Sequence, residues 1–230
     1  MKGKRMVLVV LIGIVSAAAV AEVKPLAEPW LKAGETLVCY GDSITAGAYY
    51  VPHLKTALEA KGITVINAGL GGDKTPMALT RITEVAAHKP DAVMFFFGAN
   101  DSLIGRGRWR DEPVVEPTTF RDNLLWMIHY FRLHTTCRKF SIVAPPGCFE
   151  GESCGAFGNI GEPYRLAARE AADRANAVLI PLDAEFGWIK DAAQKGQKDL
   201  LLTRDGIHFS PFGSQRAAEI MLRHWRMADK

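Results

Sequence analysis

Three side chains near opposite ends of the sequence have the types that covalent acyl transfer requires. Ser43 lies in Gly41-Asp42-Ser43, and Asp205 and His208 lie in Asp205-Gly206-Ile207-His208. A serine hydroxyl is a weak nucleophile at neutral pH, so it needs a base within hydrogen-bond reach and a third group that orients the base. On a helical or tightly turning backbone, the spacing of Asp205 and His208 places both side chains on one face. We therefore expect Ser43 as the nucleophile, His208 as the base and Asp205 as the orienting acid.

A serine site also needs hydrogen-bond donors for the oxyanion that forms during acyl transfer. Gly72 follows one apolar segment, and Asn100 follows the next. A glycine lets the backbone N–H approach a substrate closely, and the asparagine side chain supplies an amide N–H. We expect these two donors together with the backbone N–H of Ser43, with Gly71 as the alternative to Gly72.

Each motif has a structural alternative when it is read alone. Asp42 and Ser43 are both favoured helix caps, and residues 205–208 also fit a surface turn that carries an exposed histidine. Residues 67–73 and 98–101 fit ordinary turns rich in glycine, asparagine and aspartate. The catalytic interpretation therefore depends on a fold that brings all four segments together.

Apolar segments alternate along the chain with segments whose apolar residues have helical spacing. The expected strands are residues 36–40, 64–67, 92–97, 140–144 and 178–181. The expected helices are residues 51–60, 76–88, 120–134, 163–176, 185–195 and 211–226. This alternation predicts a parallel sheet that is covered by helices on both faces and binds ligands at the carboxyl ends of its strands. Ser43, Gly72 and Asn100 each follow a strand, so we expect them at one edge of the sheet.

The motifs resemble the four blocks of the SGNH hydrolases, also called the GDSL esterase/lipase family. The blocks are residues 41–45, 67–73, 98–101 and 205–208, in that order. The resemblance implies an α/β fold with three α/β/α layers, flavodoxin-like, with about five parallel strands. It also implies the catalytic roles of Ser43, His208 and Asp205, the oxyanion donors Ser43, Gly72 and Asn100, and neither a metal nor an organic cofactor.

Four further residues are candidates for contact with the substrate. Asp42 precedes the nucleophile directly in the sequence, and Asp101 directly follows Asn100. Shortly after them come Arg108 and Trp109. Trp109 is suited to stack on a sugar, and Arg108 is suited to bind an anionic group. The alternative is a solvated loop in which the arginines pair with neighbouring acidic residues.

Residues 1–21 have the pattern of a secretory signal peptide. Three basic residues precede an apolar stretch from Met6 to Ala21, which ends in the small-x-small sequence Ala19-Val20-Ala21. An uncleaved anchor is the alternative, but the stretch is short for the ~20 residues that span a membrane. We expect a secreted or periplasmic protein with no membrane contact after cleavage, and a single catalytic domain over residues 22–230.

The composition excludes several classes of partner. The sequence has 28 Lys and Arg and 25 Asp and Glu, and three of the basic residues lie in residues 1–21, so the mature chain has 25 of each. This balance gives no electrostatic reason to expect nucleic acid as a partner. No cysteine or histidine spacing is that of a metal site.

Export makes the cysteines candidates for oxidation. Cys148 and Cys154 lie six positions apart in a glycine-rich segment, which fits either a disulfide or two free thiols. Cys39 and Cys137 adjoin expected strands, so we expect them as small buried residues.

Together these features predict an exported serine esterase that forms an acyl-enzyme on Ser43. The expected substrates are short-chain, in particular acetyl, esters of carbohydrates or other small alcohols. Lysophospholipase, thioesterase and sugar O-acyltransferase activities fit the same residues. A non-catalytic carbohydrate-binding protein is the alternative from a different class, and the sequence does not define the oligomeric state.

Overall fold

A computed structural model describes residues 25–228, apart from residues 48, 103–112, 147–160 and 194–200. Five parallel strands form one sheet in the order β2-β1-β3-β4-β5. They are β1 (Thr36–Gly41), β2 (Thr64–Gly69), β3 (Ala92–Phe96), β4 (Lys139–Val143) and β5 (Val178–Ile180). The order reverses between β1 and β3, the position at which parallel α/β sheets bind their ligands.

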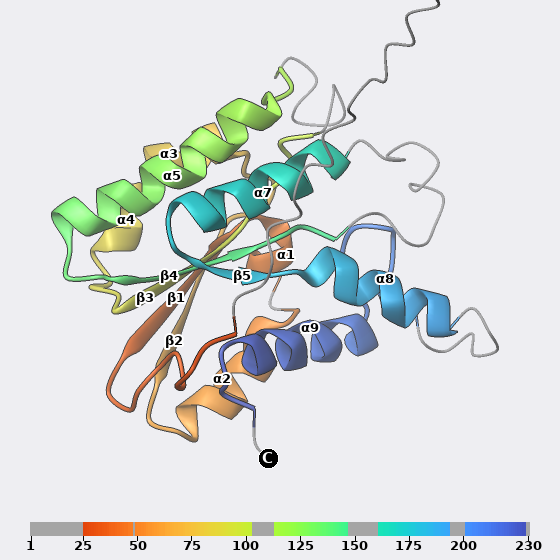
Figure 1. The fold of residues 1–230 in the computed structure, drawn as a ribbon, viewed down its shortest axis with the longest axis horizontal. Coiled ribbons are helices and arrows are strands. Elements are labelled where there is room, and N and C mark those ends of the chain that lie inside the picture. The colour runs from red at the N-terminus through yellow and green to blue at the C-terminus, as the bar shows by residue number, and fades with distance from the viewer. Residues whose placement is uncertain (1–24, 48, 103–112, 147–160, 194–200, 229–230) are drawn as a thin grey trace, which may run out of the picture.

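Helices cover both faces of the sheet (Figure 1). One face carries α2 (Val51–Glu59), α8 (Leu182–Ala193) and α9 (Pro211–His224). The other carries α3 (Thr75–Thr80), α4 (Ile82–Ala86), α5 (Pro117–His134) and α7 (Glu162–Arg174). The predicted three-layer α/β/α fold with a five-stranded parallel sheet is therefore confirmed.

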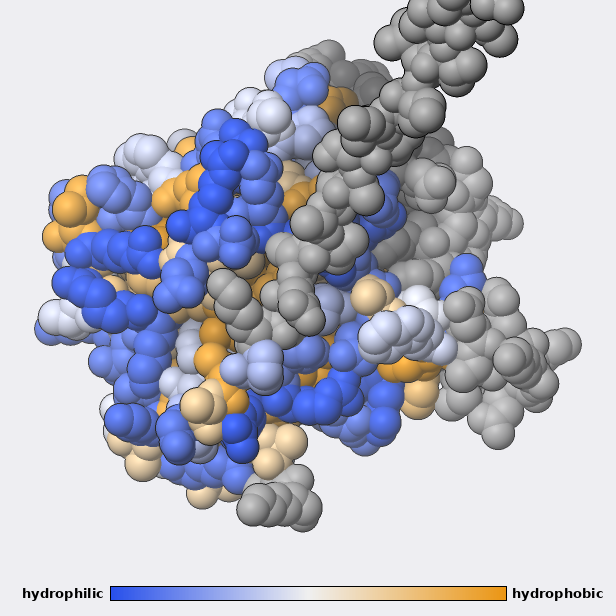
Figure 2. All heavy atoms as spheres, viewed as in Figure 1, coloured by the Kyte–Doolittle hydropathy of each residue, from blue (hydrophilic) through white to orange (hydrophobic). Residues whose placement is uncertain are grey.

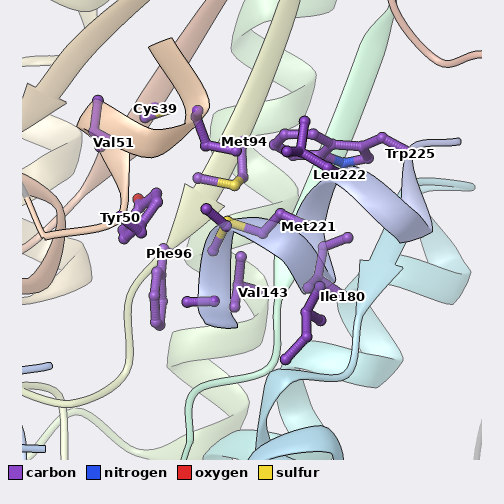
Figure 3. Close-up of a cluster of buried hydrophobic side chains, with 14 of the residues drawn as sticks. Cys39, Tyr50, Val51, Met94, Phe96, Val143, Ile180, Met221, Leu222 and Trp225 are labelled. Carbon is purple, nitrogen blue, oxygen red and sulfur yellow. The ribbon is translucent and has the colours of Figure 1, made fainter. Parts of the chain in front are cut away.

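Alternate residues of each strand pack into two separate cores. Cys39 of β1 and Met94 of β3 join the core beneath α2 and α9, where Met221 of α9 also lies (Figure 3). Val38 and Phe95, which neighbour these strand residues, join the core beneath α5 and α7. Because every residue of β3 is buried, this central strand reads as a continuous apolar run in the sequence. The outer sides of the helices on the face shown in Figure 2 are mostly hydrophilic, with apolar residues between them.

Two helical segments differ from the sequence expectation. The helix expected over residues 76–88 is divided into α3 and α4 at Arg81, whose side chain turns towards the sheet edge. The short helix α1 (Ser43–Ala46) was not expected, because four residues are too few for an apolar periodicity. Both differences lie at the edge of the sheet where the chemical motifs meet.

The thiols of Cys39 and Cys137 are free and buried, as expected. Burial raises the pKa of Cys39 to about 12, which makes its thiolate form unfavourable. Cys148 and Cys154 lie outside the described residues, as do residues 1–21 with the predicted signal peptide. Within the described ranges, every helix is too short or too polar to cross a bilayer.

Candidate active site

Ser43 is the first residue of α1 and directly follows the carboxyl end of β1. The Oδ1 atom of Asp42 accepts a hydrogen bond of 2.9 Å from the backbone N–H of Ile44, so Asp42 is the N-cap of α1. The capping alternative is thus correct for Asp42. It does not compete with a catalytic role for Ser43, because the cap holds the serine at the ligand-binding edge of the sheet.

Ser43, His208 and Asp205 form a continuous chain of hydrogen bonds. Ser43 Oγ lies 2.9 Å from His208 Nε2, although the two residues are 165 positions apart. His208 Nδ1 lies 2.7 Å from Asp205 Oδ2. This network fits a neutral imidazole whose Nδ1–H donates to the carboxylate and whose Nε2 accepts from the serine hydroxyl. The arrangement has the geometry that activates a serine for attack.

The turn that carries the acid and the base is held by hydrogen bonds between its own residues. Asp205 Oδ1 accepts hydrogen bonds from the N–H groups of Ile207 at 3.0 Å and His208 at 2.7 Å. The N–H of Arg204 donates to the carbonyl of His208 at 2.8 Å. Burial alone would raise the pKa of Asp205, but hydrogen bonds from the His208 side chain and from these two backbone groups lower it to about 2. The carboxylate therefore stays ionised at neutral pH and can stabilise an imidazolium.

The expected oxyanion donors lie on the loops that follow β2 and β3. Asn100 is buried, and its Nδ2 donates a hydrogen bond of 3.1 Å to the carbonyl of Asp73, which ties the two loops together. Gly72 has φ of 78°, a conformation that other residues rarely adopt. A Cβ atom added to Gly71 would meet nothing within 4 Å, and its φ is not positive. The backbone thus requires a glycine at Gly72 and not at Gly71. The choice of Gly72 over Gly71 as the oxyanion donor stays a prediction.

The loop after β2 is also joined to the loop that carries Ser43. The N–H of Leu70 donates to the carbonyl of Gly41 at 3.0 Å. Asn67 Nδ2 donates to the carbonyl of Thr45 in α1 at 2.8 Å. Since Asn100 bonds the same loop from the other side, the first three sequence blocks meet at one edge of the sheet.

Arg81 is a residue of this edge that the sequence did not reveal. Its guanidinium pairs with Asp73 at 2.7 Å and donates to the carbonyls of Ala68 at 2.8 Å and Gly41 at 3.2 Å. It also lies over the ring of Tyr40, 4.6 Å from the centroid. Arg81 therefore links the ends of β1 and β2 to the loop that contains Gly72. No local sequence pattern predicts this role, because an arginine within an amphipathic helical segment normally faces solvent.

Asp42 and Asp101, which the sequence suggested as contacts for the substrate, expose no surface in the structure. Both are fully buried beneath the site, and Asp101 Oδ1 accepts hydrogen bonds from the N–H and hydroxyl of Thr75 at 2.9 and 2.6 Å. Burial is the main reason that the pKa rises to about 7 for Asp42 and about 6 for Asp101. Through these hydrogen bonds, the buried carboxyl groups position the segments that follow β1 and β3. Arg108 and Trp109 lie outside the described residues.

The described residues contain no group of three or more histidine, cysteine, aspartate or glutamate side chains placed to hold a metal ion. The site itself brings together a serine, an imidazole, a carboxylate and a side-chain amide.

A parallel sheet that carries a Ser–His–Asp chain at its carboxyl edge defines the class of serine hydrolases with an α/β fold. Within that class, the model of the GDSL-like lipase/acylhydrolase family matches residues 39–216, and the chain belongs to this family. The match confirms the resemblance found in the four sequence blocks. It also places the chain among enzymes that hydrolyse carboxylic esters.

Individual relatives are distant. An arylesterase from Vibrio mimicus is 39% identical over 84 residues, which make up 32% of this chain and 42% of that protein. An α/β hydrolase named LAE5 from the metagenome of Lake Arreo, Spain, superposes with a TM-score of 0.72 at 22% identity, over 88% of this chain and all of that one. Axe2, an acetylxylan esterase from Geobacillus stearothermophilus, superposes with a TM-score of 0.68 at 22% identity, over 84% and 95% of the two chains. At this identity, the two superpositions establish a shared fold.

Proposed function

We propose that this protein is an exported serine esterase that hydrolyses short-chain, in particular acetyl, esters of carbohydrates or other small alcohols. The observation that carries the proposal is the hydrogen-bond chain from Ser43 Oγ through His208 to Asp205, with distances of 2.9 and 2.7 Å. The pattern of residues 1–21 supports export through a cleaved signal peptide.

In the first half of the reaction, Ser43 Oγ attacks the carbonyl carbon of the ester while its proton moves to His208 Nε2. The carbonyl oxygen becomes an oxyanion that accepts hydrogen bonds from the Ser43 and Gly72 N–H groups and the Asn100 amide. When the tetrahedral intermediate collapses, the bond to the alcohol breaks and His208 gives its proton to the leaving oxygen. The product is an ester between Ser43 and the acyl group.

In the second half, His208 takes a proton from a water molecule that attacks the acyl-enzyme. The acid is released, and the proton returns to Ser43 Oγ. Asp205 stays ionised throughout and stabilises the imidazolium of each half-reaction. The low pKa of Asp205, about 2, supports this role.

Names of related proteins support the choice of ester. Axe2 is described as an acetylxylan esterase, and its catalytic mutants replace a serine, an aspartate and a histidine by alanine, the last two lying three positions apart. Asp205 and His208 have the same spacing here. Because the arylesterase relative is matched over less than half of its length, its name supports only the broader class of ester hydrolysis.

The proposal is tested with the mature protein on a series of p-nitrophenyl esters of increasing acyl length and on acetylated xylan. We expect p-nitrophenyl acetate to be cleaved fastest, acetate to be released from the polysaccharide, and a fluorophosphonate to label the protein. Ser43→Ala should abolish labelling and lower kcat by about 10⁶-fold. The far-UV circular dichroism and Tm of this variant serve as the control for folding.

Three outcomes would contradict the proposal in different ways. If the fluorophosphonate does not label the wild-type protein and the protein cleaves no ester, the catalytic interpretation is wrong. A rate that rises steadily towards long acyl chains would instead favour a lipase or lysophospholipase. Transfer of the acetyl group to an added sugar, without release of acetate, would identify an acyltransferase.

A further inference from the structure

An aromatic ring adjoins the catalytic imidazole, a cation adjoins that ring, and the acyl-transfer steps above use neither of them. Tyr49 lies between α1 and α2, six positions after Ser43, and its ring centroid is 5.8 Å from that of His208. The guanidinium carbon of Arg204 lies 4.8 Å from the centroid of the Tyr49 ring, and Arg204 Nη2 donates a hydrogen bond to the Tyr49 hydroxyl. The two loops that carry the nucleophile and the base therefore also supply a paired tyrosine and arginine beside the base.

The triad does not depend on this pair for its hydrogen bonds. His208 is already oriented through Nδ1 by Asp205 and through Nε2 by Ser43. The Arg204 side chain is exposed, and in the described part of the chain its guanidinium bonds a phenol hydroxyl rather than a carboxylate. A guanidinium has five N–H donors, so it can bond a ligand while it holds Tyr49. A charged donor fixed at the mouth of a site is suited to recognition.

The position of the pair shows which half of the ester it would meet. His208 Nε2 returns the proton of Ser43 to the leaving alcohol, so the alcohol oxygen must come within hydrogen-bond reach of this atom. Groups beside the imidazole are therefore candidates for contact with the alcohol. The oxyanion donors, which act on the acyl carbonyl, lie on the separate loops after β2 and β3.

We propose that Tyr49 and Arg204 determine the specificity for the alcohol, by recognising one that is rich in oxygen acceptors, such as a sugar ring. The hydroxyl groups of the sugar accept hydrogen bonds from the guanidinium, which the hydroxyl of Tyr49 holds in place. The inference rests on the proposed esterase function and assigns the alcohol side of the same site. It implies that the pair acts while the alcohol is present and has no effect once the acetyl-enzyme has formed.

The test compares two esters that deliver the same acetyl group to Ser43, an O-acetylated methyl xyloside and ethyl acetate. We expect Arg204→Met to lower kcat/KM for the xyloside about 10-fold more than for ethyl acetate, because a hydrogen bond from a charged donor is lost only with the sugar. The rate constant for breakdown of the acetyl-enzyme, followed by quenched-flow mass spectrometry, should equal that of the wild type. Tyr49→Phe keeps the ring and removes the hydroxyl that holds the guanidinium, so it should give a smaller selective loss.

Arg138→Met is the matched control. Arg138 is an exposed arginine at the amino end of β4, on the opposite edge of the sheet, and its replacement should not alter the ratio of the two substrates. An equal loss with both esters, or slower acetyl-enzyme breakdown, would show that Arg204 and Tyr49 only position His208. An unchanged ratio in both variants would also overturn the inference. All these outcomes require a wild-type protein that acetylates Ser43, so they differ from a failure of the esterase proposal itself.

Discussion

The turn of residues 203–209 and the loops after β2 and β3 supply opposite sides of the candidate site, and they differ in burial and in the range of their contacts. The side chains of Asp205 and His208 are 51% and 29% exposed, whereas Asn100 is 5% exposed and Asp101 is fully buried. The backbone of residues 204–208 is held by hydrogen bonds between residues at most four positions apart, and the side chains of His208 and Arg204 add the long-range bonds to Ser43 and Tyr49. The loops are held by contacts across 26 to 40 positions.

Because of this difference, we expect the turn and the loops to respond differently to substitution. A locally folded turn tolerates the loss of one side chain without a change in the rest of the molecule. Loops that depend on buried polar contacts couple catalysis to stability, because an unpaired buried group destabilises the folded state. The following substitutions separate the two behaviours.

Asp205→Asn should have the largest effect on activity among these substitutions, with little effect on stability. The asparagine oxygen can still accept from the backbone of the turn, but the amide no longer stabilises the imidazolium or fixes the required tautomer. We expect kcat to fall by about 10⁴-fold, as measured with p-nitrophenyl acetate. An undiminished rate would contradict the orienting role of Asp205, and a large fall in Tm would contradict the local character of the turn.

Asn100→Ala should lower kcat by about 10²–10³-fold, because one oxyanion donor is removed. KM for a small acetyl ester should change little, since the donor acts on charge that develops in the transition state. Unlike Asp205→Asn, this variant should also have a lower Tm, because Nδ2 of Asn100 ties its loop to the carbonyl of Asp73. A normal kcat in this variant would show that Asn100 is not an oxyanion donor.

Arg81→Ala should primarily affect stability. Removal of the guanidinium leaves Asp73, which is 3% exposed, without its 2.7 Å ion pair. We expect a loss of about 3 kcal/mol, at the lower end for a broken buried pair because the Arg81 side chain is 15% exposed. The corresponding fall in Tm is roughly 6–12 °C for a domain of this size. Arg121→Ala, which breaks pairs with Asp122 and Glu170, both of them exposed, is the control and should change Tm much less.

Asp42→Asn should have the smallest effect, visible as a change in the pH dependence of stability. Folding raises the pKa of Asp42 from ~3.9, the ordinary value for an unfolded aspartate, to about 7. The folded state therefore binds the proton more tightly, so stability falls as pH rises between these values, and the loss is complete above pH about 7. The variant lacks this titration, so the difference in Tm between pH 5 and pH 8 should be smaller by roughly 5–10 °C.

Asp122→Asn, at an exposed position, is the matched control and should keep the pH dependence of the wild type. An equal change of Tm between pH 5 and pH 8 in both variants would show that Asp42 does not take up a proton on folding.

The five strands and their order of appearance were predictable, because runs of apolar residues such as residues 92–97 are typical of strands buried on both faces. The triad and Asn100 were recognisable as motifs, since each lies directly after a strand or within one short turn. The division of the helix over residues 76–88 was not predictable. Apolar spacing continues through Arg81, and only the contacts of its side chain with Asp73, Ala68 and Gly41 mark the break.

The sequence by itself determined the strands, the local turn of residues 205–208 and the types of group available for catalysis, because these depend on neighbouring residues. The tertiary structure decided which groups reach solvent. Asp42 and Asp101 stand beside catalytic candidates in the sequence but are buried beneath them, while Tyr49 and Arg204 meet across 155 positions beside the imidazole. Burial and long-range contacts depend on how the chain packs as a whole, which no short stretch of sequence specifies.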